Sequence, residues 1–162
     1  MAFDSESFSS GHTLIQRLEE YNPWWERGRE ASLTGDYSSL QDIFYQTYDE
    51  LHQQQRRLIP ITGPDGAGKT ALLEQLASAH IDPDFVEKFV RDADRRERAQ
   101  ERLVSPSNVL YIPLRDDPVF QLQPEAQLRA AVDHFETHVL RHSHSSPHYI
   151  LLDDLHTVER PN

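Results

Sequence analysis

The sequence contains no cysteine, which excludes disulfides and thiolate metal sites. It also lacks any apolar run approaching the roughly 20 residues that a membrane-spanning helix requires. Residues 1–10 are acidic and serine-rich, without the basic and apolar segments of a secretory signal, and we expect them to form a flexible tail. These absences favour an intracellular chain, and we expect a cytoplasmic protein with no membrane partner.

Lysine is scarce, since Lys69 and Lys88 are the only two in 162 residues. Acidic residues outnumber basic ones by 27 to 16, which gives a formal net charge of −11. Many carboxylates and few lysines are typical of a halophilic protein, and a GC-rich coding bias is the alternative. A surface this negative repels nucleic acid unless one face is locally basic, so no nucleic-acid partner is evident from this segment.

The periodicity of the apolar residues indicates an α/β fold. Residues 11–57 form an N-terminal helical segment, and residues 58–162 form the core. Three short apolar runs predict strands, at residues 58–62, 109–114 and 149–152. Helical patterns lie between them, at residues 69–80, 82–102 and 124–139. Strands separated by helices predict a mostly parallel sheet in a three-layer arrangement, although Pro60 cannot donate to a ladder in the first strand.

Two helices are expected in the N-terminal segment. The first begins with the capping-box pair Thr13 and Gln16 and ends at Asn22-Pro23, and the second runs over residues 35–57. Trp24 and Trp25 follow the first helix and are the only tryptophans. Because adjacent indoles are expected to point in different directions, we expect one of them to pack on the domain.

The segment from Gly63 to Thr70 matches the pattern G-x-x-x-x-G-K-[ST] without a mismatch. Glycines let such a loop curl so that its N–H groups face phosphate oxygens, and the following helix adds the positive end of its dipole. The Lys69 ammonium is then expected to reach the β- and γ-phosphates and the Thr70 hydroxyl to bind Mg²⁺. The expected nucleotide-binding residues are Gly63, Pro64, Asp65, Gly66, Ala67, Gly68, Lys69, Thr70 and Ala71.

An apolar strand ends in two carboxylates at Asp153 and Asp154. In a doubly wound sheet the carboxyl ends of the strands face the ligand crevice. Asp153 is therefore expected near the metal, through a water molecule, and Asp154 is expected to polarise the attacking water. An acidic turn after a buried strand is the alternative.

Four segments together resemble a group of prokaryotic, often archaeal, AAA+-like P-loop ATPases. They are residues 22–25, 63–70, 111–114 and 152–156. The resemblance implies ATP and Mg²⁺ as cofactors, Walker A and Walker B motifs, and ATP hydrolysis with Lys69 and Asp154 as catalytic residues. The wider superfamily has glutamate where this chain has Asp154, and His156 stands where the group has an uncharged polar residue.

In that group the chain continues with another strand, a sensor residue, an arginine finger and a lid. We therefore expect this sequence to be a truncated N-terminal portion with an incomplete sheet. Self-association or a partner chain that supplies the missing half is the alternative, and hydrolysis is expected from the completed protein.

Two other polar clusters each have more than one possible role. His134, His138 and His142 share a helix face and could hold a metal, although an exposed helix end without carboxylate partners is favoured. Residues 115–117 follow the second strand and either line the crevice or form a surface turn.

Two other functions fit the phosphate loop. A small-molecule or nucleotide kinase has a similar loop, but such kinases usually start at it and carry an arginine-rich lid. A nucleotide-binding interaction module without turnover is the third hypothesis, favoured by the aspartate at position 154.

Overall fold

The computed structural model describes residues 5–28, 41–53, 58–115, 117–140 and 146–155. The chain divides into two units, each described by itself. Unit 1 comprises residues 1–31 and 105–162, and unit 2 comprises residues 32–104. No helix among the described residues is long and apolar enough to cross a membrane.

Unit 1 is a mixed α/β structure built on two parallel strands. Its elements in chain order are α1 (Ser5–Tyr21), α2 (Trp24–Arg27), η2 (Pro106–Asn108), β1 (Val109–Pro113), α7 (Pro118–Leu122), α8 (Pro124–His134), the π-helix η3 (Phe135–Val139) and β2 (Tyr149–Asp153). β1 pairs with β2 in register from Val109 opposite Tyr149 to Pro113 opposite Asp153. The parallel pairing of these two predicted strands is confirmed, and the helices between them form the crossover that a parallel pair requires.

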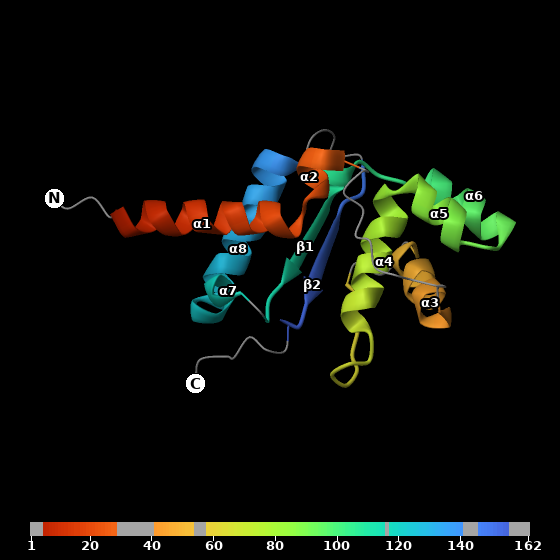
Figure 1. The fold of residues 1–162 in the computed structure, drawn as a ribbon, viewed down its shortest axis with the longest axis horizontal. Helices are drawn as coiled ribbons and strands as arrows, with labels where there is room; N and C mark the ends of the chain where they lie inside the picture. The colour runs from red at the N-terminus through yellow and green to blue at the C-terminus, as the bar shows by residue number, and fades with distance from the viewer. Residues whose placement is uncertain (1–4, 29–40, 54–57, 116, 141–145, 156–162) are drawn as a thin grey trace. The chain divides into compact units, whose positions relative to one another are not determined.

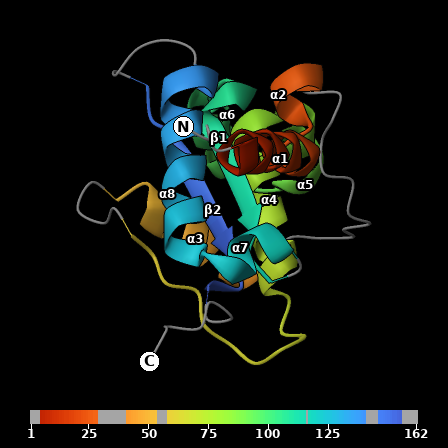
Figure 2. The same ribbon diagram turned by 90° about the vertical axis from the view of Figure 1, so that its left-hand side faces the viewer.

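The core of unit 1 lies where α1 and α8 pack on β1 (Figure 1). The turned view of Figure 2 looks along α1 and shows α8 running beside the strands. Apolar side chains from α1, β1, α7, α8 and η3 meet there: Leu14, Leu18, Leu110, Ile112, Leu114, Phe120, Ala131 and Phe135. Burial of this set on one face of β1 is the main stabilising contribution that the hydrophobic effect makes to the unit.

Asn22 ends α1 and is fully buried against β1. Its side-chain amide donates to the carbonyl of Leu18 at 2.8 Å and to that of Tyr111 at 2.9 Å, and its oxygen accepts from the Tyr111 N–H at 2.6 Å. One side chain therefore satisfies both main-chain groups of Tyr111 on the edge of β1 that faces away from β2.

Both tryptophans reach the same edge of β1. The indole nitrogens of Trp24 and Trp25 donate to the carbonyl oxygen of Val109 at 3.0 Å and 2.9 Å. Trp24 is fully buried, and Trp25 stacks on Phe135 with ring centroids 6.0 Å apart. The prediction that one of the two indoles packs on the domain is confirmed by Trp24, and both indole nitrogens reach one carbonyl, whose two lone pairs can accept both.

The described residues of unit 2 form four helices: α3 (Asp42–Leu51), α4 (Lys69–Ile81), α5 (Pro83–Phe89) and α6 (Ala93–Glu101). α5 starts where predicted, with Pro83 in its first turn and the Asp82 carboxylate accepting from the Asp84 N–H at 2.9 Å. The predicted single helix over 82–102 is two helices. The chain turns after α5, and the Asp92 side chain caps α6 by accepting from the Arg95 N–H at 2.8 Å.

The predicted strand over residues 58–62 was wrong, because the structure gives these residues no regular secondary structure. Pro60 lacks the N–H that a ladder needs, and Leu58 is 85% exposed. Other boundaries also differ. α1 begins at Ser5, before the expected capping box, and the second N-terminal helix is described only as α3, since residues 29–40 and 54–57 lie outside the described residues.

Candidate functional site

The predicted phosphate loop is an exposed turn that leads directly into α4. The N–H of Ala67 donates to the carbonyl of Pro64 at 3.2 Å and closes the turn. Gly66 and Gly68 have φ values of 78° and 89°, in the left-handed region that side chains with a Cβ rarely adopt. The two glycines therefore let the chain reverse and enter the helix within a few residues.

The N-terminus of α4 carries the positive end of a 13-residue helix. Gly68 is the residue before the helix, and its carbonyl accepts the N–H of Leu72 at 2.9 Å. Gly68 has no side chain that could cap this end, and the first turn of α4 contains no acidic residue. The main-chain amides of the first turn thus point from α4 toward the loop.

The Lys69 ammonium folds back over the loop. It donates to the carbonyl of Gly63 at 2.7 Å and to that of Pro64 at 2.9 Å. A lysine ammonium has three donors, and these two bonds hold it at the start of the loop. The cation, the glycine turn and the helix N-terminus therefore lie together, and binding of an anion there stays a prediction.

An open pocket of about 550 Å³ lies beside the loop, between α3, residues 59–62 and the first turns of α4. Its polar lining includes Gln41, Gln46, Thr47 and Glu50 from α3 and the residue before it. Ala67, Gly68, Lys69 and Ala71 line it from the loop side. A cavity of this size is in the range of small-molecule sites.

Asp153 is the last residue of β2 and is buried. Its Oδ2 accepts a hydrogen bond from the Tyr111 hydroxyl at 3.0 Å. Asp154 follows with a φ of 56° and is half-buried. Aspartate tolerates this left-handed conformation better than most residues. Both carboxylates belong to unit 1 and the phosphate loop belongs to unit 2, so their joint action on one metal stays a prediction.

The structure decides part of the open question at residues 115–117. Arg115 is exposed, and position 116 lies outside the described residues. Asp117 is buried and caps α7, where its carboxylate accepts from the Val119 N–H at 2.9 Å and from the Tyr21 hydroxyl. Burial and this hydrogen bond raise the pKa of Tyr21. Asp117 therefore has a structural contact and is not a surface turn residue.

The histidines of α8 and η3 do not form a metal site among the residues that the structure describes. The rings of His134 and His138 stack with centroids 5.0 Å apart, and no group of three potential ligands was found in the described part of the chain. His142 and His156 lie outside those residues.

A histidine pair in unit 2 was missed by the sequence interpretation. His52, just after α3, and His80, in the last turn of α4, have their Nε2 atoms 3.0 Å apart. His80 Nδ1 also bonds the Leu76 carbonyl, so His80 Nε2 accepts and His52 Nε2 donates. Burial is the main cause that lowers the pKa of His80 to about 3 and that of His52 to about 4. No sequence spacing predicts this contact, because the residues lie on different helices.

Comparisons with known proteins do not identify a relative of this chain. No family model, no curated protein and no solved structure matches it. The resemblance to AAA+-like ATPases therefore stays a hypothesis that rests on the motif residues and on their local geometry.

Proposed function

We propose that residues 63–71 bind the phosphates of ATP together with Mg²⁺, as part of an ATPase of the AAA+-like type. The observation that carries the proposal is the loop itself. A sequence that matches the phosphate-binding pattern places two glycines in the left-handed region and leads into the N-terminus of α4. Anions bind such helix ends because the amides and the dipole both favour negative charge.

Lys69 is the cation of this site. With nucleotide bound, its ammonium would leave the Gly63 and Pro64 carbonyls and contact the β- and γ-phosphates. Thr70, in the first turn of α4, supplies a hydroxyl ligand for Mg²⁺. Bound Mg²⁺ neutralises charge on the phosphates and so assists transfer of the γ-phosphoryl group.

The pocket beside the loop is the proposed place of the nucleoside. Its volume of about 550 Å³ and its glutamine and threonine side chains suit a polar ring system next to the phosphates. Asp153 and Asp154 stay the predicted residues for the metal and for the attacking water, and hydrolysis depends on them.

The chain offers a matched pair of lysines to test this site. Lys69→Ala is expected to remove ATP–Mg²⁺ binding measured by calorimetry, because it deletes the only ammonium of the loop. Lys88 is the other lysine of the chain; it is exposed, and its ammonium lies 5.1 Å from the centroid of the Phe89 ring. The Lys88→Ala variant is expected to bind ATP–Mg²⁺ like the wild type. Equal affinity of the Lys69→Ala variant and the wild type would overturn the assignment.

Phosphate release separates the proposal from its alternatives. The AAA+-like ATPase releases phosphate to water, whereas a kinase transfers it only when an acceptor is added. An interaction module binds ATP and shows neither reaction. The Asp154→Asn variant tests the predicted role of Asp154 in phosphate release. It removes the carboxylate but keeps a residue that tolerates the left-handed backbone.

A further inference from the structure

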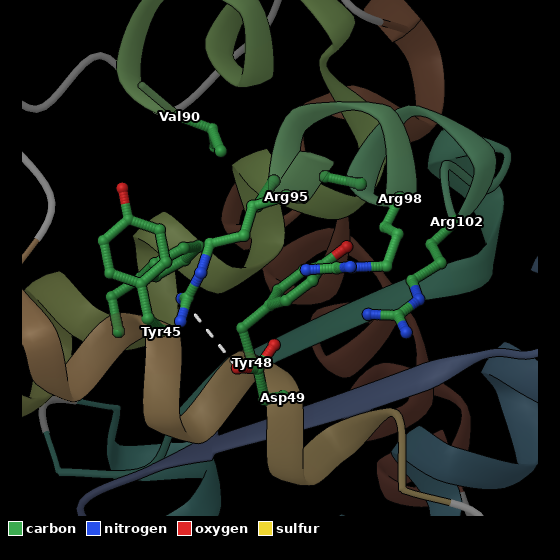
Figure 3. A pocket seen from close by; sticks show the side chains of 10 residues that line it. Tyr45, Tyr48, Asp49, Val90, Arg95, Arg98 and Arg102 are labelled. Carbon is green, nitrogen blue, oxygen red and sulfur yellow. Dashed lines mark ion pairs between the residues drawn. The ribbon is translucent and has the colours of Figure 1, made fainter. Parts of the chain in front are cut away.

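A second feature of unit 2 is a set of arginines on α6 and on the residue that follows it. Three of them face two tyrosines and one aspartate of α3 across a small recess, and we call this set the arginine recess: Tyr45, Tyr48, Asp49, Arg95, Arg98 and Arg102. Figure 3 shows the three arginine side chains extending from the α6 region toward the tyrosines. Phe44, Ala79, Val90 and Ala99 complete the lining with apolar groups.

Helix geometry brings these arginines together. Positions 95, 98 and 102 are spaced by three and four residues and so share one side of α6 and its C-terminal end. Arg96 lies on another side and has a different role. Its Nε donates to the Val90 carbonyl at 2.9 Å and its guanidinium lies 3.5 Å from Glu87. Arg96 is therefore bound by acceptors within the protein, in contrast to Arg98 on the same helix.

The positive charge of the arginine recess is only partly compensated. Its single carboxylate is Asp49, which lies 3.8 Å from Arg95. Arg95 and Arg102 lie over the rings of Tyr45 and Tyr48, at 4.7 Å and 5.8 Å from the centroids. Arg98 has no ion pair within the described ranges of the chain. Three guanidinium groups against one carboxylate are unusual in a chain of net charge −11.

We propose that the arginine recess is a binding site for one oxyanion, a phosphate or carboxylate group held between Arg98 and Arg102. Planar guanidinium groups bind both anions through paired N–H donors, and they do so more strongly where apolar walls reduce contact with water. The recess encloses a free volume of only about 10 Å³, about enough for one water molecule, so the oxyanion binds at its mouth, where Arg98 is exposed.

This site is separate from the phosphate loop. α3 contributes Ile43, Gln46 and Thr47 to the pocket beside the loop, and it contributes Tyr45, Tyr48 and Asp49 to the arginine recess. The two linings share no residue. Since the loop is also proposed to bind phosphate, the test has to distinguish the two sites, and the Lys69→Ala background does so.

The experiment is an NMR titration of the full chain carrying Lys69→Ala, with inorganic phosphate in one arm and acetate in the other, at constant ionic strength. The arginine Nε–Hε signals are followed. Saturable shifts of the Arg98 and Arg102 signals are expected, with phosphate binding more tightly than acetate because it carries more charge. Acetate binding more tightly would assign the site to carboxylates and still support an oxyanion site.

Two variants make the result specific. Arg98→Gln is expected to weaken phosphate binding about tenfold, because it removes one charged donor pair from the recess. Arg91→Gln is the control, since Arg91 is an exposed arginine of the same unit outside the recess. Arg98 is exposed, so its replacement should not unfold the unit, and an unchanged circular dichroism spectrum checks this. Shifts that do not saturate, or equal affinities of both variants, would overturn the proposal.

Discussion

Asn22 forms two hydrogen bonds with the main chain of Tyr111, although the two residues are 89 positions apart. Asn22→Asp keeps the shape of the side chain but replaces the NH₂ group that serves the Leu18 and Tyr111 carbonyls with a second oxygen. Each buried group that loses its partner costs roughly 1–3 kcal/mol, so we expect a destabilisation of about 3 kcal/mol. Urea unfolding followed by tryptophan fluorescence measures it, because both tryptophans belong to unit 1.

The control for that variant is Gln16→Glu, which makes the same amide-to-acid change on the exposed side of α1. Its effect should stay within about 0.5 kcal/mol, as for most surface substitutions. Similar unfolding midpoints for Asn22→Asp and Gln16→Glu would contradict the role of Asn22 in holding β1.

The pair of His52 and His80 predicts that the stability of unit 2 depends on pH. An unfolded histidine binds a proton near its ordinary pKa of 6.5, whereas His52 and His80 in the folded unit do so only near pH 4 and pH 3. The unfolded chain therefore binds more protons between these values, so stability is lost as the pH falls from 6.5 toward 4. Burial and the nearby Arg102 oppose charging of the pair, while Asp49 favours charging of His52.

Hydrogen exchange of the α4 amides at pH 7, 5.5 and 4.5 measures this effect in unit 2. His52→Phe keeps an aromatic ring next to Tyr48 and His80 but cannot ionise, so the loss of protection at low pH should be smaller than in the wild type. His148→Gln, an exposed histidine of unit 1, serves as the control. Identical pH profiles for the wild type and His52→Phe would show that the pair does not titrate as described.

The loop glycines are expected to differ in their tolerance of alanine. Gly68→Ala places a Cβ on a residue with φ of 89°, which costs roughly 1–2 kcal/mol and should weaken ATP binding by distorting the start of α4. Gly63→Ala is the matched control, because its Cβ would meet the Ala67 Cβ at 3.5 Å, an ordinary contact. Thermal unfolding gives both costs, and equal losses of stability would argue against the left-handed turn.

The raised pKa of Tyr21 predicts that unit 1 loses stability at alkaline pH. Burial and the hydrogen bond to Asp117 raise its pKa, so the stabilisation from this contact is complete below pH 10 and is lost as the pH rises further. Tyr21→Phe should therefore destabilise unit 1 by about 1–2 kcal/mol at pH 8 and by less at pH 11. Urea midpoints at the two pH values test this, and a constant difference would contradict the raised pKa.

Local patterns predicted the starts of α4 and α5 in unit 2 and the parallel strands of unit 1, because caps and periodicity act over a few residues. Asp82 with Pro83 fixed the start of α5, and Gly68 with Lys69 the start of α4. The same reasoning failed at residues 58–62, where an apolar composition suggested a strand but Pro60 and the exposure of Leu58 oppose one.

Contacts between distant residues could not be predicted in the same way. The bond between His52 and His80 and the meeting of Trp24 and Trp25 at Val109 depend on how helices and strands pack, which no spacing in the sequence encodes. In the candidate site the loop and Lys69 were predictable because their residues are consecutive. The contact of Tyr111 with Asp153 was not, since it depends on the register of two strands.

The contacts of Asn22, Trp24 and Trp25 with β1 occupy hydrogen-bonding groups on one edge of the sheet. The hydrogen-bonding groups that another chain segment would need at Val109 and Tyr111 are already engaged by these three side chains. A further strand that pairs with this sheet would therefore not join alongside β1 at these positions.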